Sequence, residues 1–155
     1  MATYNFTDGS ITGVEKPHDT TPRGYELFVL RNIVDCTKQT LDAGDGDVAQ
    51  VINVPAGTLV LYAFINVRTA EGSNGTVDLG YGGNADQWGD ALAVDATGIA
   101  QSPILTAPVF FNAADTIDIT ATVDTADVDI DGAVLEVVAV CLAMNDSIDA
   151  GGDPT

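Results

Sequence analysis

The sequence predicts an all-β domain. Short runs of β-branched and aromatic residues recur along the chain, and turns rich in Gly, Asp and Asn separate them. No stretch keeps the 3.6-residue hydrophobic period of a long helix. With 155 residues, of which 46% are hydrophobic, the chain is long enough to bury one core without metal or disulfide support. Together these observations favour a jelly-roll-like antiparallel β-sandwich of about eight strands.

The chain divides into three regions. Residues 1–24 are polar, contain several glycines and prolines, and are expected to form an extended N-terminal arm, either disordered or laid along a neighbouring subunit. Residues 25–144 carry the strand patterns and form the predicted sandwich. Residues 145–155 are an acidic C-terminal tail.

Within the sandwich, the alternating or continuously apolar segments predict strands over 25–34, 48–54, 59–69, 76–80, 116–123 and 133–144, and residues 109–111 precede a turn. The segments 59–69 and 76–80 are expected to pair as a hairpin, and 81–88 to form a Gly- and Asn-rich loop. Residues 91–95 fit a short strand or a single helical turn. In segment 116–123 the polar side chains, Asp118 among them, are expected to face solvent.

The charge is concentrated in turns. Asp and Glu number 23 against five Lys and Arg, a net charge of −18, and aspartate supplies 19 of the acids. Aspartate disfavours helices and strands and favours turns. Such a charge excludes nucleic acid and anionic membranes as partners because both would repel the chain. It suits salty surroundings, where screening relieves self-repulsion, and it equally suits simple solubility.

The sequence also indicates where the chain is made. Residues 1–15 lack the basic start and apolar run of a signal peptide, which predicts a protein made in the cytoplasm. No segment approaches the ~20 apolar residues of a membrane helix. Cys36 and Cys141 stand in apolar contexts and are interpreted as buried free thiols, with a disulfide between them as the alternative.

The residues do not indicate an enzyme. The single histidine, His18, lies in the polar arm, away from any Gly-x-Ser-x-Gly elbow or phosphate-binding loop. Carboxylate pairs of the kind that hydrolyse glycosides carry no information in a chain with 23 acids. We therefore expect no catalytic residues.

A candidate cation site lies at Asp127, Asp129 and Asp131. Together with Gly132 they match the opening Asp-x-Asp-x-Asp-Gly of a calcium loop, in which alternate carboxylates converge on one hard cation. The twelfth position of such a loop would be Val138 rather than Glu, and the flanks are strand-like. The sequence thus allows a structural Ca²⁺ or other divalent cation here, or a solvated acidic turn that protects a strand edge. No other cofactor is expected.

A candidate binding site surrounds the only tryptophan. Trp88 follows Asn84 and Gln87 in the predicted loop, and an exposed indole with amide neighbours stacks on sugar rings in carbohydrate-binding modules. The alternative is a tryptophan that anchors a loop or a subunit interface.

Several segments resemble small jelly-roll structural proteins of tailed viruses: Gln50–Val60, Val67–Gly72, Thr76–Gly80, and Ala114–Ile117 with the strand that follows. The resemblance covers roughly residues 45–143. It implies a virion structural protein, either a capsid decoration (cement) protein or a vertex (turret-like) component. It further implies a homo-oligomer, commonly a trimer, that binds the major capsid protein or other virion proteins and assembles in the host cytoplasm. The acidic, lysine-poor composition resembles proteins of marine or halophilic settings. The alternative function is a carbohydrate- or receptor-binding module of a tail or cell-surface appendage.

Overall fold

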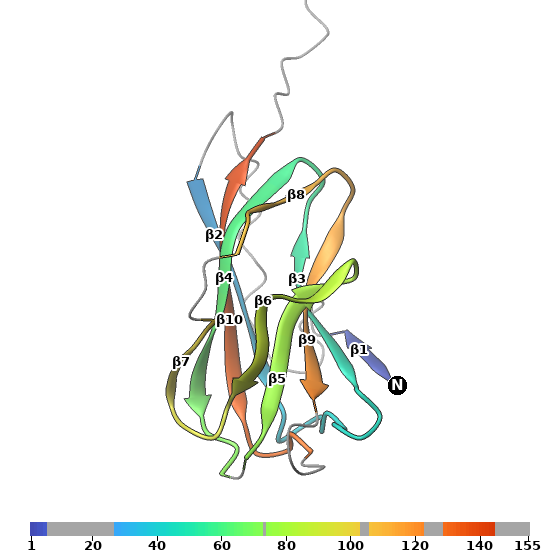
Figure 1. Ribbon diagram of the computed structural model, residues 1–155, viewed down its shortest axis with the longest axis vertical. Coiled ribbons are helices and arrows are strands. Elements are labelled where there is room, and N and C mark those ends of the chain that lie inside the picture. Colours follow the sequence, from blue (N-terminus) through green and yellow to red (C-terminus); the bar gives the residue numbers. More distant parts are fainter. Residues whose placement is uncertain (6–26, 73, 103–105, 123–128, 145–155) are drawn as a thin grey trace, which may run out of the picture.

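The computed structural model describes residues 1–5, 27–72, 74–102, 106–122 and 129–144. All regular structure in these residues is β (Figure 1). The strands are β1 Thr3–Asn5, β2 Leu27–Asp35, β3 Val48–Val54, β4 Thr58–Thr69, β5 Thr76–Tyr81, β6 Asn84–Ala93, β7 Gly98–Ala100, β8 Val109–Phe111, β9 Asp115–Thr122 and β10 Val134–Ala143. In this part of the chain no helix is long and apolar enough to cross a membrane.

Two sheets face each other (Figure 1). One has the order β1-β3-β9-β5-β6 and the other β2-β10-β4-β7, with β8 pairing on β4. All described pairings are antiparallel except that of β1 with β3. The predicted antiparallel, jelly-roll-like sandwich is therefore confirmed, with ten strands in the described residues where about eight were expected.

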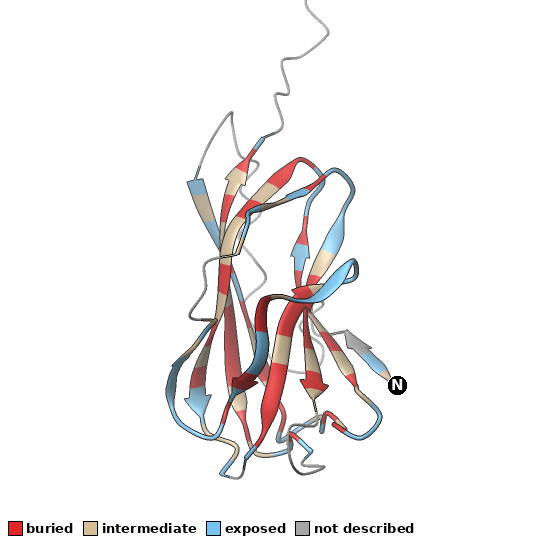
Figure 2. Ribbon diagram, viewed as in Figure 1, coloured by how far each residue is buried: buried red, intermediate tan, exposed pale blue. Residues whose placement is uncertain are grey.

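The core lies between the two sheets, where Figure 2 shows buried residues on both layers. Alternate residues of β9 (Ile117, Ile119) and of β4 (Ala63, Ile65) are fully buried, as a sandwich with one inward side per sheet requires. Asn32 crosses between the layers, since its side-chain amide donates to the carbonyl oxygen of Val51 at 2.8 Å.

Two local predictions were wrong. Segments 59–69 and 76–80 do not pair as a hairpin: β4 pairs with β10, β7 and β8, while β5 belongs to the opposite sheet. The turn between them carries the chain from one sheet to the other. The expected loop 81–88 is instead the tip of a hairpin, in which Tyr81 pairs with Asn84 and β6 continues to Ala93.

The start of the expected arm belongs to the sandwich. Strand β1 extends the edge of β3 in parallel, pairing Thr3 with Val48. The buried carboxylate of Asp47 accepts hydrogen bonds from the backbone N–H groups of Ala2 (2.7 Å) and Asp42 (3.2 Å), which fixes this N-terminal segment. The rest of the arm, 6–24, and the tail, 145–155, lie outside the described residues.

Carboxylates tie together the loops at the end of the sandwich where β10 begins. Both oxygens of Glu71 accept from the N–H of Gly132, and one of them also accepts from the N–H of Ala133 at 2.9 Å. Asp129 accepts from the N–H of Ala43 at 3.3 Å. The carboxylates in these turns therefore accept hydrogen bonds from backbone N–H groups that would otherwise have no protein partner.

Replacing Glu71 with alanine is expected to lower the free energy of unfolding by about 1–2 kcal/mol, because two partly buried N–H groups lose their acceptor. Urea unfolding followed by circular dichroism measures the change. Asp95→Ala, which removes an exposed acid in the turn after β6, is the matched control and should leave stability within about 0.5 kcal/mol. Equal losses in both variants would show that Glu71 acts only through its charge.

Candidate functional site: the outer face of the β2-β10-β4 sheet

The most distinctive surface is the outer side of the β2-β10-β4 sheet. Its register stacks apolar side chains in rows across neighbouring strands. The first row is Leu27, Leu142, Leu59 and Phe110, and the second is Val29, Val140 and Tyr62. The third is Arg31, Val138 and Phe64. We call the apolar members of these three rows the apolar face.

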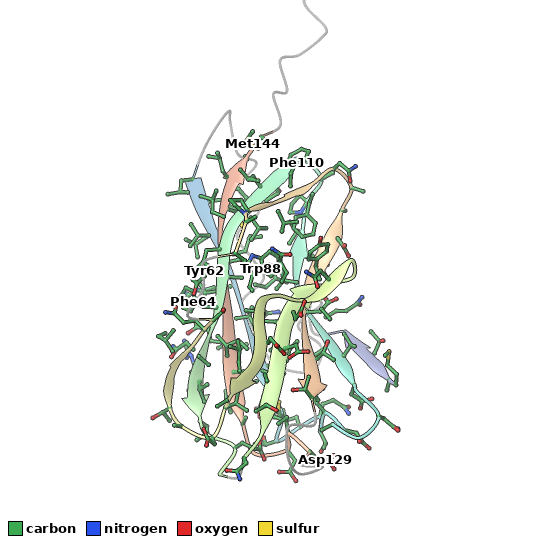
Figure 3. The ribbon with its side chains drawn as sticks, viewed as in Figure 1. Tyr62, Phe64, Trp88, Phe110, Asp129 and Met144 are labelled. Carbon is green, nitrogen blue, oxygen red and sulfur yellow. The ribbon has the colours of Figure 1, made fainter. Side chains whose placement is uncertain are left out.

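The apolar face is open to solvent. Leu27 is 62% exposed, Val29 56% and Phe110 53%. The rings of Tyr62 and Phe64 stack with centroids 6.1 Å apart (Figure 3). Figure 3 also places Phe110 and Met144 together at the end of the sandwich where β10 finishes. A sandwich core does not need these side chains, so this face is the part of the surface best suited to a partner.

A charge cluster borders the apolar face. Glu136 lies in the fourth row beside Asn66, whose amide donates to Glu136 Oε2 at 3.1 Å. Arg68 donates through Nε to the same oxygen at 3.1 Å and places Nη2 3.0 Å from Oε1. Arg31 Nη1 lies 3.7 Å from Oε1. Burial alone would raise the pKa of Glu136, but these hydrogen bonds and the two arginine charges outweigh it and lower the pKa.

The two outer faces differ in charge. Arg31 and Arg68 are two of the three Lys and Arg residues among those described, and with Glu136 and Asp35 they leave the strands of the β2-β10-β4 sheet with no net charge. The opposite sheet carries five aspartates: Asp78, Asp86, Asp90, Asp115 and Asp118. The chain's acidity is thus distributed away from the apolar face.

Asp118 does not face solvent as the strand pattern predicted. It is only 8% exposed, and its Oδ1 has no hydrogen-bond partner within the described part of the chain. Its neighbour on β5 is Gly80, and a Cβ at Gly80 would stand 2.2–2.3 Å from the backbone of Asn84 and Ala85, which folds over this site. Burial raises the pKa of Asp118 to about 6; a Thr116 hydrogen bond opposes this increase in part, and the nearby Asp115 charge adds a smaller increase.

The predicted sugar site is not assembled. Trp88 is 1% exposed and lies between the sheets (Figure 3), with its ring centroid 5.9 Å from that of Tyr81. Asn84 and Gln87 remain near the surface, where Asn84 donates to Gln87 Oε1 at 3.0 Å and Gln87 donates to the carbonyl of Ala107 at 3.1 Å. The prediction of Trp88 as an exposed stacking platform was wrong, because β6 turns this side chain into the core. The structure supports the alternative in which tryptophan anchors the hairpin.

The candidate cation site is only partly described. Asp127 lies outside the described residues, while Asp129 and Asp131 are both exposed. Figure 3 shows Asp129 at the end of the molecule opposite Met144. No group of three His, Cys, Asp or Glu side chains within the described ranges could hold a metal ion. Cation binding at Asp127, Asp129 and Asp131 stays a prediction.

The two cysteines are free and buried, as interpreted from the sequence. Burial raises the pKa of each thiol to about 12, with the charges of Glu71, Asp35 and Asp131 contributing at Cys36. Both therefore remain protonated at neutral pH and act as small core side chains.

Sequence reasoning missed the Arg31–Glu136–Arg68 cluster. A lone Glu in the apolar run 133–144 was the available signal, because a buried strand accepts an acid only where cations from its neighbours reach it. The partners come from strands far apart in the sequence, so their identity required the register.

Solved chains with a similar fold come from structures of virus particles. No family model matches the sequence, and no curated protein matches it. One similar solved chain comes from a structure described as the capsid of Ralstonia phage GP4. It has a TM-score of 0.63 and 15% identity, and the match covers 93% of this chain and 99% of that one. Another comes from the capsid asymmetric unit of cyanophage Pam1. Its TM-score is 0.55 with 15% identity, over 83% of this chain and 92% of that one. The predicted resemblance to virion structural proteins is thus confirmed at the level of fold.

Proposed function

We propose that the chain is a non-enzymatic structural protein of a tailed-virus virion, of the capsid decoration (cement) or vertex (turret-like) type. It acts by self-association and by adhesion to the major capsid protein or other virion proteins. The observation that carries the proposal is the match to two phage capsid chains over nearly their whole lengths. An exposed apolar face on the sandwich supports the adhesive part of the role.

The alternative, a carbohydrate- or receptor-binding module, depended on an exposed Trp88. The indole is 1% exposed and lies in the core, so this ring does not offer a face to a sugar beside Asn84 and Gln87.

Mass spectrometry of density-purified particles of the encoding virus tests the proposal. We expect peptides of this chain to band with the particles, in a copy number comparable with that of the major capsid protein for a decoration protein. A vertex component would be present in far fewer copies. Peptides found only in the soluble fraction of infected cells would contradict a virion role.

A further inference from the structure

We propose that the apolar face receives a second copy of this chain. The inference rests on the self-association in the proposed function and deepens it, because it assigns the contact to one surface. The face is built from the outward side chains of β2, β10, β4 and β8, and three of these, Leu27, Val29 and Phe110, are more than half exposed.

The size of the face fits the centre of a protein contact. Its three rows cover three to four strands about 4.8 Å apart and five residues of about 3.3 Å along each strand, roughly 250–300 Å² in plan. That is close to the lower end of the largest apolar patches on monomers, about 300–600 Å². It is about a third of the ~800 Å² that each partner buries in a standard interface. A second copy supplies an equal apolar area, and the polar rim around the two faces supplies the remainder.

The distribution of charged residues over the two sheets favours this face for contact between copies. Each copy carries −18, and the opposite sheet with its five aspartates would repel its own kind. On the apolar face, the carboxylate of Glu136 offsets Arg31 and Arg68, so two copies meet there with little net charge. A two-fold axis that runs across the strands near Val140 would set the apolar rows of one copy against the apolar rows of the other in reversed order. It would also place the two Arg31–Glu136–Arg68 clusters at opposite rims, where water solvates the excess positive charge.

Strand β2 adds a second means of contact. It pairs with β10 on one side and has no pairing strand on its other side among the described residues. The exposed Leu27 and Val29 lie on this edge strand. Apolar side chains on an open edge favour association with another chain.

The test is sedimentation velocity of the full chain over a range of concentrations, at low salt and at about 1 M salt, where the Debye length is ~3 Å. The double variant Val29→Lys/Phe110→Lys places two charges on the face at half-exposed positions that the fold tolerates. The matched control, Asn53→Lys/Ala93→Lys, adds the same charge at exposed positions of the opposite sheet. Circular dichroism verifies that both variants fold.

We expect the wild type to form oligomers that salt strengthens, and the face variant to weaken association at least about 100-fold while the control does not. A wild type that stays monomeric up to its solubility limit would overturn the inference. So would faster trypsin cleavage after Arg23 in the face variant without a change of mass, because the chain's own arm would then cover the face.

Incorporation into particles separates this inference from the proposed function. Loss of oligomers in a face variant that still enters particles supports the inference and leaves the virion role intact. A monomeric wild type whose face variant no longer enters particles assigns the face to a capsid partner and overturns the inference. Salt-strengthened oligomers of a chain absent from particles would contradict the virion role alone.

Discussion

Replacing Trp88 with alanine is expected to lower the free energy of unfolding by about 3–5 kcal/mol, because the largest fully buried side chain leaves a cavity in the core. The loss includes ring contacts: Tyr81 packs against both Trp88 and Phe111, with ring centroids 5.9 and 5.3 Å apart. Trp88→Phe should cost less, because it keeps part of the volume and has no indole N–H. In the structure that N–H has no hydrogen-bond partner among the described residues.

Chemical unfolding measures the effect, with Gln87→Ala as the control. Gln87 lies next to Trp88 in β6 but makes only surface hydrogen bonds, so its loss should cost less than about 1 kcal/mol. The emission of Trp88 should be blue-shifted in the native protein and unaffected by glycans. A small loss of stability, together with quenching by a glycan, would restore the sugar-binding interpretation of this residue.

Replacing Asp118 with asparagine is expected to raise the free energy of unfolding at pH 8 by up to about 3 kcal/mol. The carboxyl is buried with one oxygen unpartnered, and its pKa is raised from 3.8 to about 6. In the unfolded chain the pKa returns to its ordinary value, so the native state binds this proton more tightly. The resulting stabilisation is fully present below the unfolded value near 3.8 and is lost as the pH rises through about 6.

The stability difference between wild type and Asp118→Asn should therefore widen from about pH 4 to pH 7 and then level off. Thermal unfolding across this range measures it, with Asp90→Asn on exposed β6 as the control that removes one charge from the same sheet. A difference that does not change with pH, or one matched by the control, would show that Asp118 ionises as an ordinary surface acid.

Local pattern predicted individual strands well. Segment 48–54 coincides with β3, and segments 116–123 and 133–144 differ from β9 and β10 by no more than a residue or so at each end. Each of these runs has β-branched residues in continuous or alternating order, which few other structures accommodate. The hairpin tip at 81–88 was missed because Gly, Asn and Asp usually mark loops. Pairing with β5 and burial of Trp88 override that preference.

The sequence could not predict which strands pair with one another, or which backbone lies over the outer face of a strand. A turn after β4 says nothing about whether the next strand joins the same sheet, so the 59–69 and 76–80 hairpin was a reasonable but wrong inference. The two-residue period identified the outward side of Asp118 correctly. It could not show that backbone from Asn84 and Ala85 lies over that side at Gly80. The apolar face was partly visible as the apolar content of β4 and β10, but the arginines that border it became apparent only with the register.

The most direct test of the virion role is a cryo-electron microscopy reconstruction of particles of the encoding virus at side-chain resolution. We expect density on the capsid shell or at its vertices into which this β-sandwich fits, with Val29, Val140 and Phe110 buried against a second copy. A particle fully accounted for by other chains, with no density for this sandwich, would contradict it.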